Sequence, residues 1–98
     1  MCPVEDAEAT ATLLTNRAES HRQMSQDHLT IQDCTAALKL APDNVKALLR
    51  RGLAYERSEK LQAGLEDLRK ALALNPGTQM ASQGVLRITK LLKYDAAQ

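Results

Sequence analysis

Aromatic residues are almost missing from this 98-residue sequence, which contains two tyrosines, no tryptophan and no phenylalanine. Its apolar content is nonetheless ordinary at 44%, so any core must be built from aliphatic side chains and alanine. Leucine and alanine favour helices, whereas strands prefer β-branched and aromatic residues. The composition therefore predicts an all-α fold. It also weighs against nucleic acid as a partner, because unpaired bases commonly stack on aromatic rings.

Cysteine is also scarce, since Cys2 and Cys34 are the only two, and two cysteines are too few for a disulfide scaffold. The sequence contains no apolar run long enough to span a membrane. The first residues lack a basic stretch followed by an apolar one, so we expect no secretory signal. These features favour a reduced, cytoplasmic protein with no membrane partner.

Groupings typical of catalysis or metal binding are missing as well. His21 and His28 have no further ligand at metal-binding spacing. Asp33 and Asp67 are lone carboxylates, and no glycine-rich phosphate loop or Ser-His-Asp grouping is present. We therefore expect a protein that is not an enzyme and that needs no metal or other cofactor.

The net charge of +1 hides an uneven distribution along the chain. Residues 1–42 carry six acids and three bases, a net charge of −3, whereas residues 43–98 carry six acids and ten bases, a net charge of +4. This asymmetry favours an acidic partner for the second half, although charged side chains on solvated helix faces would give the same pattern.

The most informative pattern appears when the sequence is aligned with itself at an offset of 34 residues, with no gap. Residues 14–42 then share seven identities with residues 48–76. The identical pairs are Leu14 and Leu48, Arg17 and Arg51, Asp33 and Asp67, Ala37 and Ala71, Leu38 and Leu72, Leu40 and Leu74, and Pro42 and Pro76. The chain therefore contains two tandem repeats.

Each repeat should form a helix–turn–helix hairpin, because apolar residues recur at three- and four-residue spacing and a proline follows each second helix. The expected helices span about residues 5–24, 27–40, 45–57 and 59–74. We place a turn at Ser25 and expect Asp43 and Ser58 to cap the two later helices. Gly52 and Gly64 fall inside helices, where glycine costs about 1 kcal/mol relative to alanine. This predicts the close approach of a neighbouring helix at these glycines.

The remaining segment, about residues 78–94, is amphipathic and should cover the exposed face of the second repeat. We therefore expect residues 1–98 to form one domain. Its parts are a lead-in, two repeats and a capping helix, over residues 1–10, 11–44, 45–78 and 79–94.

These residues resemble the tetratricopeptide repeat family, whose two-helix units carry apolar, small and proline positions in a set order. The second repeat matches that order with Leu48, Gly52, Tyr55, Gly64, Leu68, Ala71 and Pro76. The first repeat matches it more loosely with Leu14, Ala18, His21, Thr30, Cys34, Ala37 and Pro42. The resemblance covers about residues 11–94. It implies a right-handed α-solenoid fragment in which the first helix of each pair lines a concave groove for an extended peptide or a partner helix.

Two segments, 14–18 and 44–52, further resemble the carboxylate-clamp cochaperones, which grip the C-terminal Glu-Glu-Val-Asp of cytosolic seventy- and ninety-kilodalton heat-shock chaperones. By this resemblance Asn16 would bond the terminal carboxylate, and Lys46 and Arg50 would grip acidic side chains and backbone. The spacing agrees, because Lys46 and Arg50 share a helix face and Asn16 lies one repeat before Arg50. The groove should also be lined by Leu49, Leu53 and Arg57.

In that subfamily a preceding repeat supplies a further lysine and asparagine to the clamp. We expect no counterpart here, because residues 1–10 are too short for another helix pair and carry Glu5, Asp6 and Glu8. Two interpretations stay open. One is an adaptor for chaperone tails, and the other is a scaffold that binds another protein with an incomplete or inactive clamp. The uncovered face of the first hairpin also makes self-association possible. Arg17 and Arg51 should lie off the clamp face, either solvated or bridging helices.

Overall fold

The computed structural model describes residues 4–24 and 26–97 of the chain, with side chains described for residues 9–21, 23, 24 and 26–93. The turn that we place at Ser25 and the thiol of Cys2 lie outside the described residues. The same holds for the side chains of Glu5, Asp6 and Glu8.

Helices make up the fold, and no strand occurs in the described ranges. The helices are α1 (Val4–Gln23), α2 (Asp27–Leu40), α3 (Val45–Arg57), α4 (Leu61–Leu74) and α5 (Gln79–Ala97). This confirms the predicted all-α architecture of two hairpins and a capping helix. The first helix begins at Val4, within the segment that we treat as a lead-in, and α4 begins two residues later than expected.

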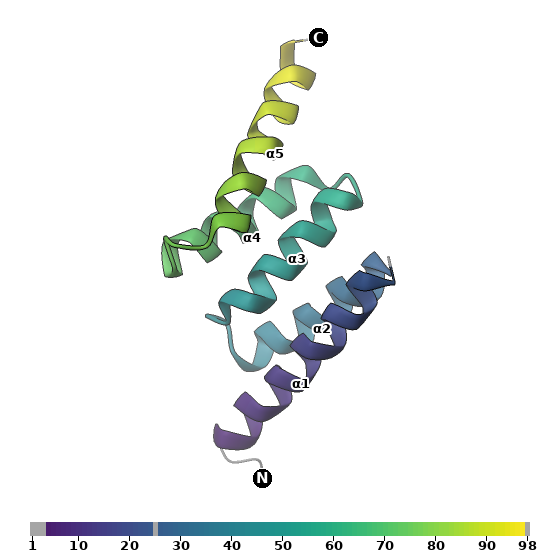
Figure 1. Cartoon of the computed structure of the whole chain (residues 1–98), viewed down its shortest axis with the longest axis vertical. Helices are drawn as coiled ribbons and strands as arrows, with labels where there is room; N and C mark the ends of the chain where they lie inside the picture. The colour runs from purple at the N-terminus through teal and green to yellow at the C-terminus, as the bar shows by residue number, and fades with distance from the viewer. Residues whose placement is uncertain (1–3, 25, 98) are drawn as a thin grey trace.

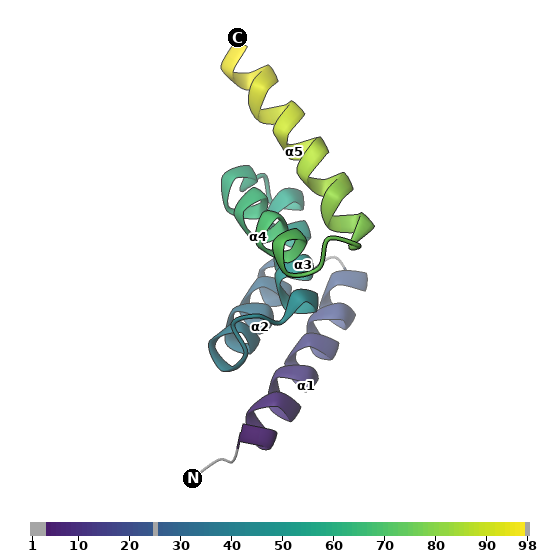
Figure 2. The same ribbon diagram turned by 90° about the vertical axis from the view of Figure 1, so that its left-hand side faces the viewer.

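The helices stack in chain order along an elongated body of 53 × 27 × 20 Å. Helices α1, α3 and α5 lie toward one side, and α2 and α4 lie behind them (Figures 1 and 2). Helix α3 contacts each of the other four helices, while α1 and α5 make no contact of comparable extent with each other. The side chains of α3 therefore hold the first hairpin, the second hairpin and the capping helix together.

The core consists of two clusters of unequal size. The larger cluster joins the second hairpin to α5 and is built on the buried residues Leu48, Leu65, Leu68, Ala71, Ala81 and Ile88. The smaller cluster belongs mainly to the first hairpin and contains Ala11, Ala18, Cys34, Ala37 and Ala47. Because alanine buries much less apolar surface than leucine, the second half of the molecule gains more hydrophobic stabilisation than the first.

Cys34 takes the place of a core hydrophobe in that smaller cluster. Its side chain is fully buried, and burial raises the pKa of the thiol to about 12. The thiol is therefore protonated at neutral pH and unreactive, since the thiolate is the reactive form of cysteine.

The two helices of the second hairpin approach closely at Gly52 and Gly64, which confirms the prediction from their positions. A Cβ atom added at Gly64 would lie 2.9 Å from the carbonyl oxygen of Gly52, and one added at Gly52 would lie 2.8 Å from the Leu68 side chain. In the first hairpin the place of Gly64 is taken by Thr30, whose hydroxyl donates to the carbonyl oxygen of Ala18 at 3.3 Å. In the second hairpin the two helices therefore cross with backbone close to backbone, whereas in the first hairpin a hydrogen bond from a side chain to the backbone joins them.

Both predicted helix caps are wrong. The N-cap of α3 is Asn44, whose side-chain oxygen accepts from the backbone N–H of Ala47 at 3.1 Å, and Asp43 lies in the preceding turn. Ser58 is the C-cap of α3 and not the N-cap of α4. Its backbone N–H is bonded to the carbonyl groups at the end of α3, so the chain cannot start α4 until Leu61.

The chain reverses direction between α3 and α4 at a residue in the left-handed backbone conformation. Glu59 has a φ of 63°, and the N–H of Lys60 donates to the carbonyl oxygen of Tyr55 at 2.8 Å. This is the Schellman arrangement that commonly closes a helix. The first hairpin makes the equivalent bond from Gln26 to His21, also at 2.8 Å.

An arginine–aspartate pair fastens the two helices of each hairpin. In α1 and α2, Arg17 donates from Nε and Nη2 to the two carboxylate oxygens of Asp33, at 2.9 and 2.7 Å. In α3 and α4, Arg51 holds Asp67 in the same way, at 2.7 and 2.8 Å. The two aspartates are buried, and the partner of each is an arginine. The bridging role that we allowed for the arginines is confirmed.

Each arginine–aspartate pair also has a ring side chain beside it, at the same position of its repeat. The ring of His21 lies with Nε2 3.2 Å from Asp33, and at the equivalent position the ring of Tyr55 lies 5.8 Å from the Arg51 guanidinium carbon. Hydrogen bonds to the aspartates raise the pKa of Arg17 and Arg51, so both arginines remain cationic.

Candidate functional site

The residues singled out on α3 form one stripe along that helix, because positions four and three apart share a helix face. Lys46, Arg50, Leu53 and Arg57 follow one another at these spacings from the first turn of α3 to its end. The Asn44 cap determines where α3 begins and thus which turn carries each of these side chains.

A hollow of about 190 Å³ lies where this stripe meets α1 and α5. Its lining consists of Glu19 from α1, Leu49, Arg50 and Leu53 from α3, and Met80 from α5. We call this feature the central hollow. It brings together three of the predicted site residues, and it combines apolar side chains with one acid and one base.

Two guanidinium nitrogens of Arg50 contact α1 in this structure. Its Nη1 donates to the backbone carbonyl of Thr15 at 2.8 Å, and its Nε lies 3.0 Å from a carboxylate oxygen of Glu19. These two partners lie on either side of Asn16 in the sequence, so Arg50 packs against the turn of α1 that carries Asn16. The side chains of Arg50 and Glu19 are only 20% and 28% exposed.

Asn16 and Lys46 are exposed, and neither lines the central hollow. They lie on α1 and α3, the two helices that also hold the Arg50–Glu19 pair. An amide and an ammonium exposed next to this pair are suitable donors for a carboxylate.

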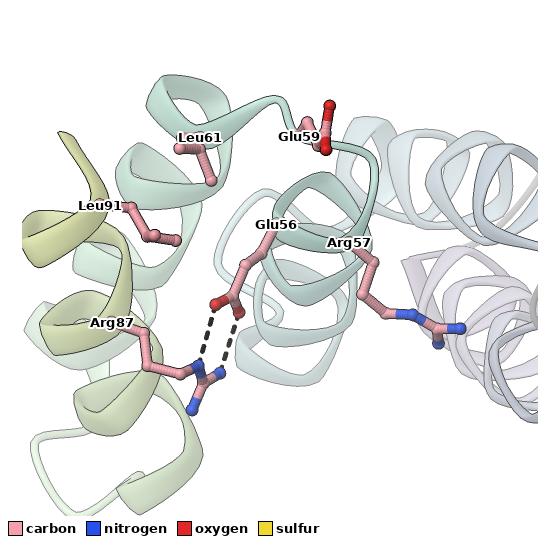
Figure 3. A pocket seen from close by; sticks show the side chains of 6 residues that line it. All are labelled: Glu56, Arg57, Glu59, Leu61, Arg87 and Leu91. Atoms are coloured by element: carbon pink, nitrogen blue, oxygen red, sulfur yellow. Dashed lines mark hydrogen bonds and ion pairs between the residues drawn. The ribbon is translucent and has the colours of Figure 1, made fainter. Parts of the chain in front are cut away.

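Arg57 lies apart from the central hollow. It lines a larger and more open pocket of about 830 Å³, whose other lining residues are Glu56, Glu59, Leu61, Arg87 and Leu91. Figure 3 shows that Arg57 points away from α5, and its Nη1 lies 3.6 Å from Asp27 at the start of α2. In the same view Arg87 of α5 donates to both carboxylate oxygens of Glu56, each at 2.9 Å. Hydrogen bonding to Glu56 raises the pKa of Arg87.

Sequence reasoning missed the two acids that pair with these arginines. Glu19 and Glu56 lie on the first helices of the two hairpins, α1 and α3. Their partners lie two helices further along the chain, Arg50 on α3 and Arg87 on the capping helix α5. No short-range spacing identifies such pairs. The available signal was the expected stacking of α1, α3 and α5, which would have brought these charges to one face.

Among the described residues, no group of His, Cys, Asp or Glu side chains could hold a metal ion. None of the helices that the structure describes is long and apolar enough to cross a membrane.

Comparison with known proteins places these observations in a family. A family model described as "Tetratricopeptide repeat" matches residues 45–78. Among curated proteins, the sperm-associated antigen 1 of Mus musculus is 38% identical over 84 residues. That match covers 86% of this chain and 9% of the relative, so the chain spans only a small part of the larger protein.

Solved structures match most of this chain. The Arabidopsis OM64 TPR domain is 36% identical with a TM-score of 0.81, and the match covers 84% of this chain and 68% of that one. The first TPR of Spaghetti (RPAP3), solved with the HSP90 peptide SRMEEVD, is 29% identical with a TM-score of 0.83. Here the match covers 85% of this chain and 66% of the other.

Proposed function

Because this chain belongs to the tetratricopeptide repeat family, a family of non-enzymatic interaction modules, we propose that it acts as a cochaperone-like adaptor. Its ligand is an acidic C-terminal peptide of the kind found at the ends of cytosolic heat-shock chaperones. The binding face is formed by α1, α3 and α5. The observation that supports this proposal is Arg50 in the central hollow, with Asn16 and Lys46 exposed on α1 and α3, two of the helices that line it.

Each group has a separate task in this proposal. The amide of Asn16 bonds the terminal carboxylate. The ammonium of Lys46 grips acidic side chains and the backbone of the peptide, since charge-assisted hydrogen bonds are roughly twice as strong as neutral ones. Leu49 and Leu53 offer apolar surface to an aliphatic side chain of the peptide. The relative solved with the peptide SRMEEVD supports this assignment, because it shares the fold of this chain.

The test is a titration of the purified chain with the peptide SRMEEVD and with its C-amidated twin, followed by calorimetry. We expect amidation to weaken binding about tenfold or more, because losing a hydrogen bond to a charged group costs about 1.5–3 kcal/mol and 1.4 kcal/mol is a factor of ten. Lys46→Ala should weaken binding of the free-acid peptide by a similar factor.

The matched control for Lys46→Ala is Lys70→Ala, which removes the same charge from an exposed position on α4. It should leave the affinity unchanged within a factor of two. Arg51 is a poor control even though it lies off the clamp face, because its loss would leave Asp67 buried without its partner. Equal affinity for the acid and the amide, or equal losses in the two lysine variants, would contradict the proposed function.

A scaffold function is the second candidate, and one observation favours it. Leu13 on α1 is 69% exposed and lines an apolar depression with Thr10, Leu14 and Arg17. A partner surface could cover this face in the way that one repeat covers the next. In either case we expect a cytoplasmic, reducing location, and it stays a prediction.

A further inference from the structure

We propose that Glu19 determines the ligand specificity of the central hollow. By pairing with Arg50, its carboxylate selects against peptides that place an acidic side chain there and favours peptides with a neutral or basic side chain at that point. This inference rests on the proposed function, since it concerns the same groove.

The geometry makes Glu19 an internal competitor for the guanidinium. One carboxylate oxygen of Glu19 lies 3.0 Å from Nε of Arg50, which is the distance that a ligand carboxylate would adopt. The other oxygen of Glu19 lies 3.5 Å from the side-chain amide of Gln23, one turn further along α1. The Arg50 contact thus places the acid at the central hollow.

Arg50 cannot turn freely toward a ligand instead. Its Nη1 is fixed by a backbone carbonyl, that of Thr15, at 2.8 Å. The guanidinium is thereby held against α1, and the site it offers to an incoming acid already contains a negative charge. A second carboxylate would lie close to the first, and like charges placed together at an interface oppose binding.

The rest of the hollow offers an incoming acid no compensation. Its other walls are the apolar side chains of Leu49, Leu53 and Met80, which supply no hydrogen-bond donor. The Arg50 and Glu19 side chains are themselves mostly buried. Asn16 and Lys46 are exposed outside the hollow, and a terminal carboxylate could therefore still bind there. Binding of the peptide's terminal carboxylate and selection against an acidic side chain therefore take place in different parts of the groove.

The test compares two peptides, SRMEEVD and SRMQQVD, in which uncharged glutamines replace the two glutamates, against three proteins. These are the unmutated chain, Glu19→Gln and Glu66→Gln. Glutamine at position 19 keeps an oxygen that can accept from Arg50 and removes only the charge. Glu66 is an exposed acid on α4, so Glu66→Gln matches the change in net charge at a distant place.

We expect Glu19→Gln to bind SRMEEVD about three- to tenfold more tightly than the unmutated chain, in line with the energy of a partly exposed charge pair. Its affinity for SRMQQVD should change by less than a factor of two, and Glu66→Gln should resemble the unmutated chain with both peptides. Far-ultraviolet circular dichroism checks that all three proteins have the same helix content.

The outcomes separate the two proposals. If both peptides bind but Glu19→Gln gains no more for SRMEEVD than for SRMQQVD, the specificity role is wrong and the proposed function stands. If Glu19→Gln alone binds SRMEEVD, the specificity role is supported in its strongest form. If no variant binds either peptide, the proposed function fails and the specificity role fails with it.

Discussion

At the scale of single residues, the arginine–aspartate pairs link helices that would otherwise meet through small side chains. Asp67 is 7% exposed and receives two hydrogen bonds from Arg51, which also donates to the hydroxyl of Thr35 in α2 at 3.2 Å. Arg51 therefore connects its own hairpin to the preceding one. The Arg17 side chain is 62% exposed and makes no such link among the contacts that the structure describes.

We predict that Asp67→Ala lowers the free energy of unfolding by about 1.5–3 kcal/mol, because the charged hydrogen bonds are lost and Arg51 is left unpaired. Urea denaturation followed by circular dichroism measures this change. The neighbouring exposed acid provides the control, and Glu66→Ala should change stability by no more than about 0.5 kcal/mol. Similar losses in the two variants would show that the pair does not stabilise the hairpin.

The sequence contained a direct signal for these pairs, whereas the expected stacking of α1 and α3 was only an indirect signal for Glu19. Arg17 and Asp33 recur as Arg51 and Asp67 at the same offset, and such joint recurrence indicates a contact that belongs to the repeat. Glu19 has Leu53 at its equivalent position, so nothing in the repeat marks it. Its role appears only when the distance between α1 and α3 is known.

At the scale of helices, the crossing of α3 and α4 depends on the absence of a side chain at Gly64. The atom that an added methyl group would meet is a backbone carbonyl oxygen, which cannot move aside as a flexible side chain can. We therefore predict that Gly64→Ala destabilises the protein by about 1–3 kcal/mol, despite the better helix propensity of alanine.

Thermal unfolding of Gly64→Ala and Gly77→Ala tests this prediction. A Cβ atom at Gly77 would meet only the Asn75 side chain, at 3.5 Å, in an exposed turn. Gly77→Ala should therefore melt within a degree or two of the unmutated protein. A Gly64→Ala protein that is as stable as the unmutated chain would show that α3 and α4 can separate at no cost.

Helix positions were predictable from the sequence, but the caps were not. Pro42 and Pro76 end the second helix of each repeat, and the apolar stripes locate the bodies of the helices. The choice between Asp43 and Asn44 as a cap depends on which residue takes extended backbone angles, and both are good capping residues. Glu59 could not be foreseen as a left-handed residue, because glycine usually fills that position.

At the scale of the molecule, the first hairpin has a free outer face and the smaller core. Leu13 on that face is 69% exposed, which favours association of two copies through α1. We predict a concentration-dependent dimer in sedimentation equilibrium. Leu13→Ser should weaken it about tenfold or more, because burying a leucine contributes about 1.5–3 kcal/mol.

The control for Leu13→Ser is Leu86→Ser, which removes a leucine that is 64% exposed on α5. This variant should associate as the unmutated chain does. A protein that remains monomeric at all concentrations, or equal effects of the two substitutions, would show that α1 is not the contact face.

The stacking of helices in chain order has a consequence for how quickly the molecule reaches its structure. Within the part of the chain that the structure describes, contacts between helices join neighbours in sequence or helices two apart. Contacts between near neighbours in sequence require little loop closure, and proteins dominated by such contacts fold in microseconds to milliseconds. The larger cluster around α3, α4 and α5 is the natural place for folding to begin, because it buries the larger side chains. The α1–α2 hairpin would then add onto an existing surface of α3, as repeats add to one end of a growing array.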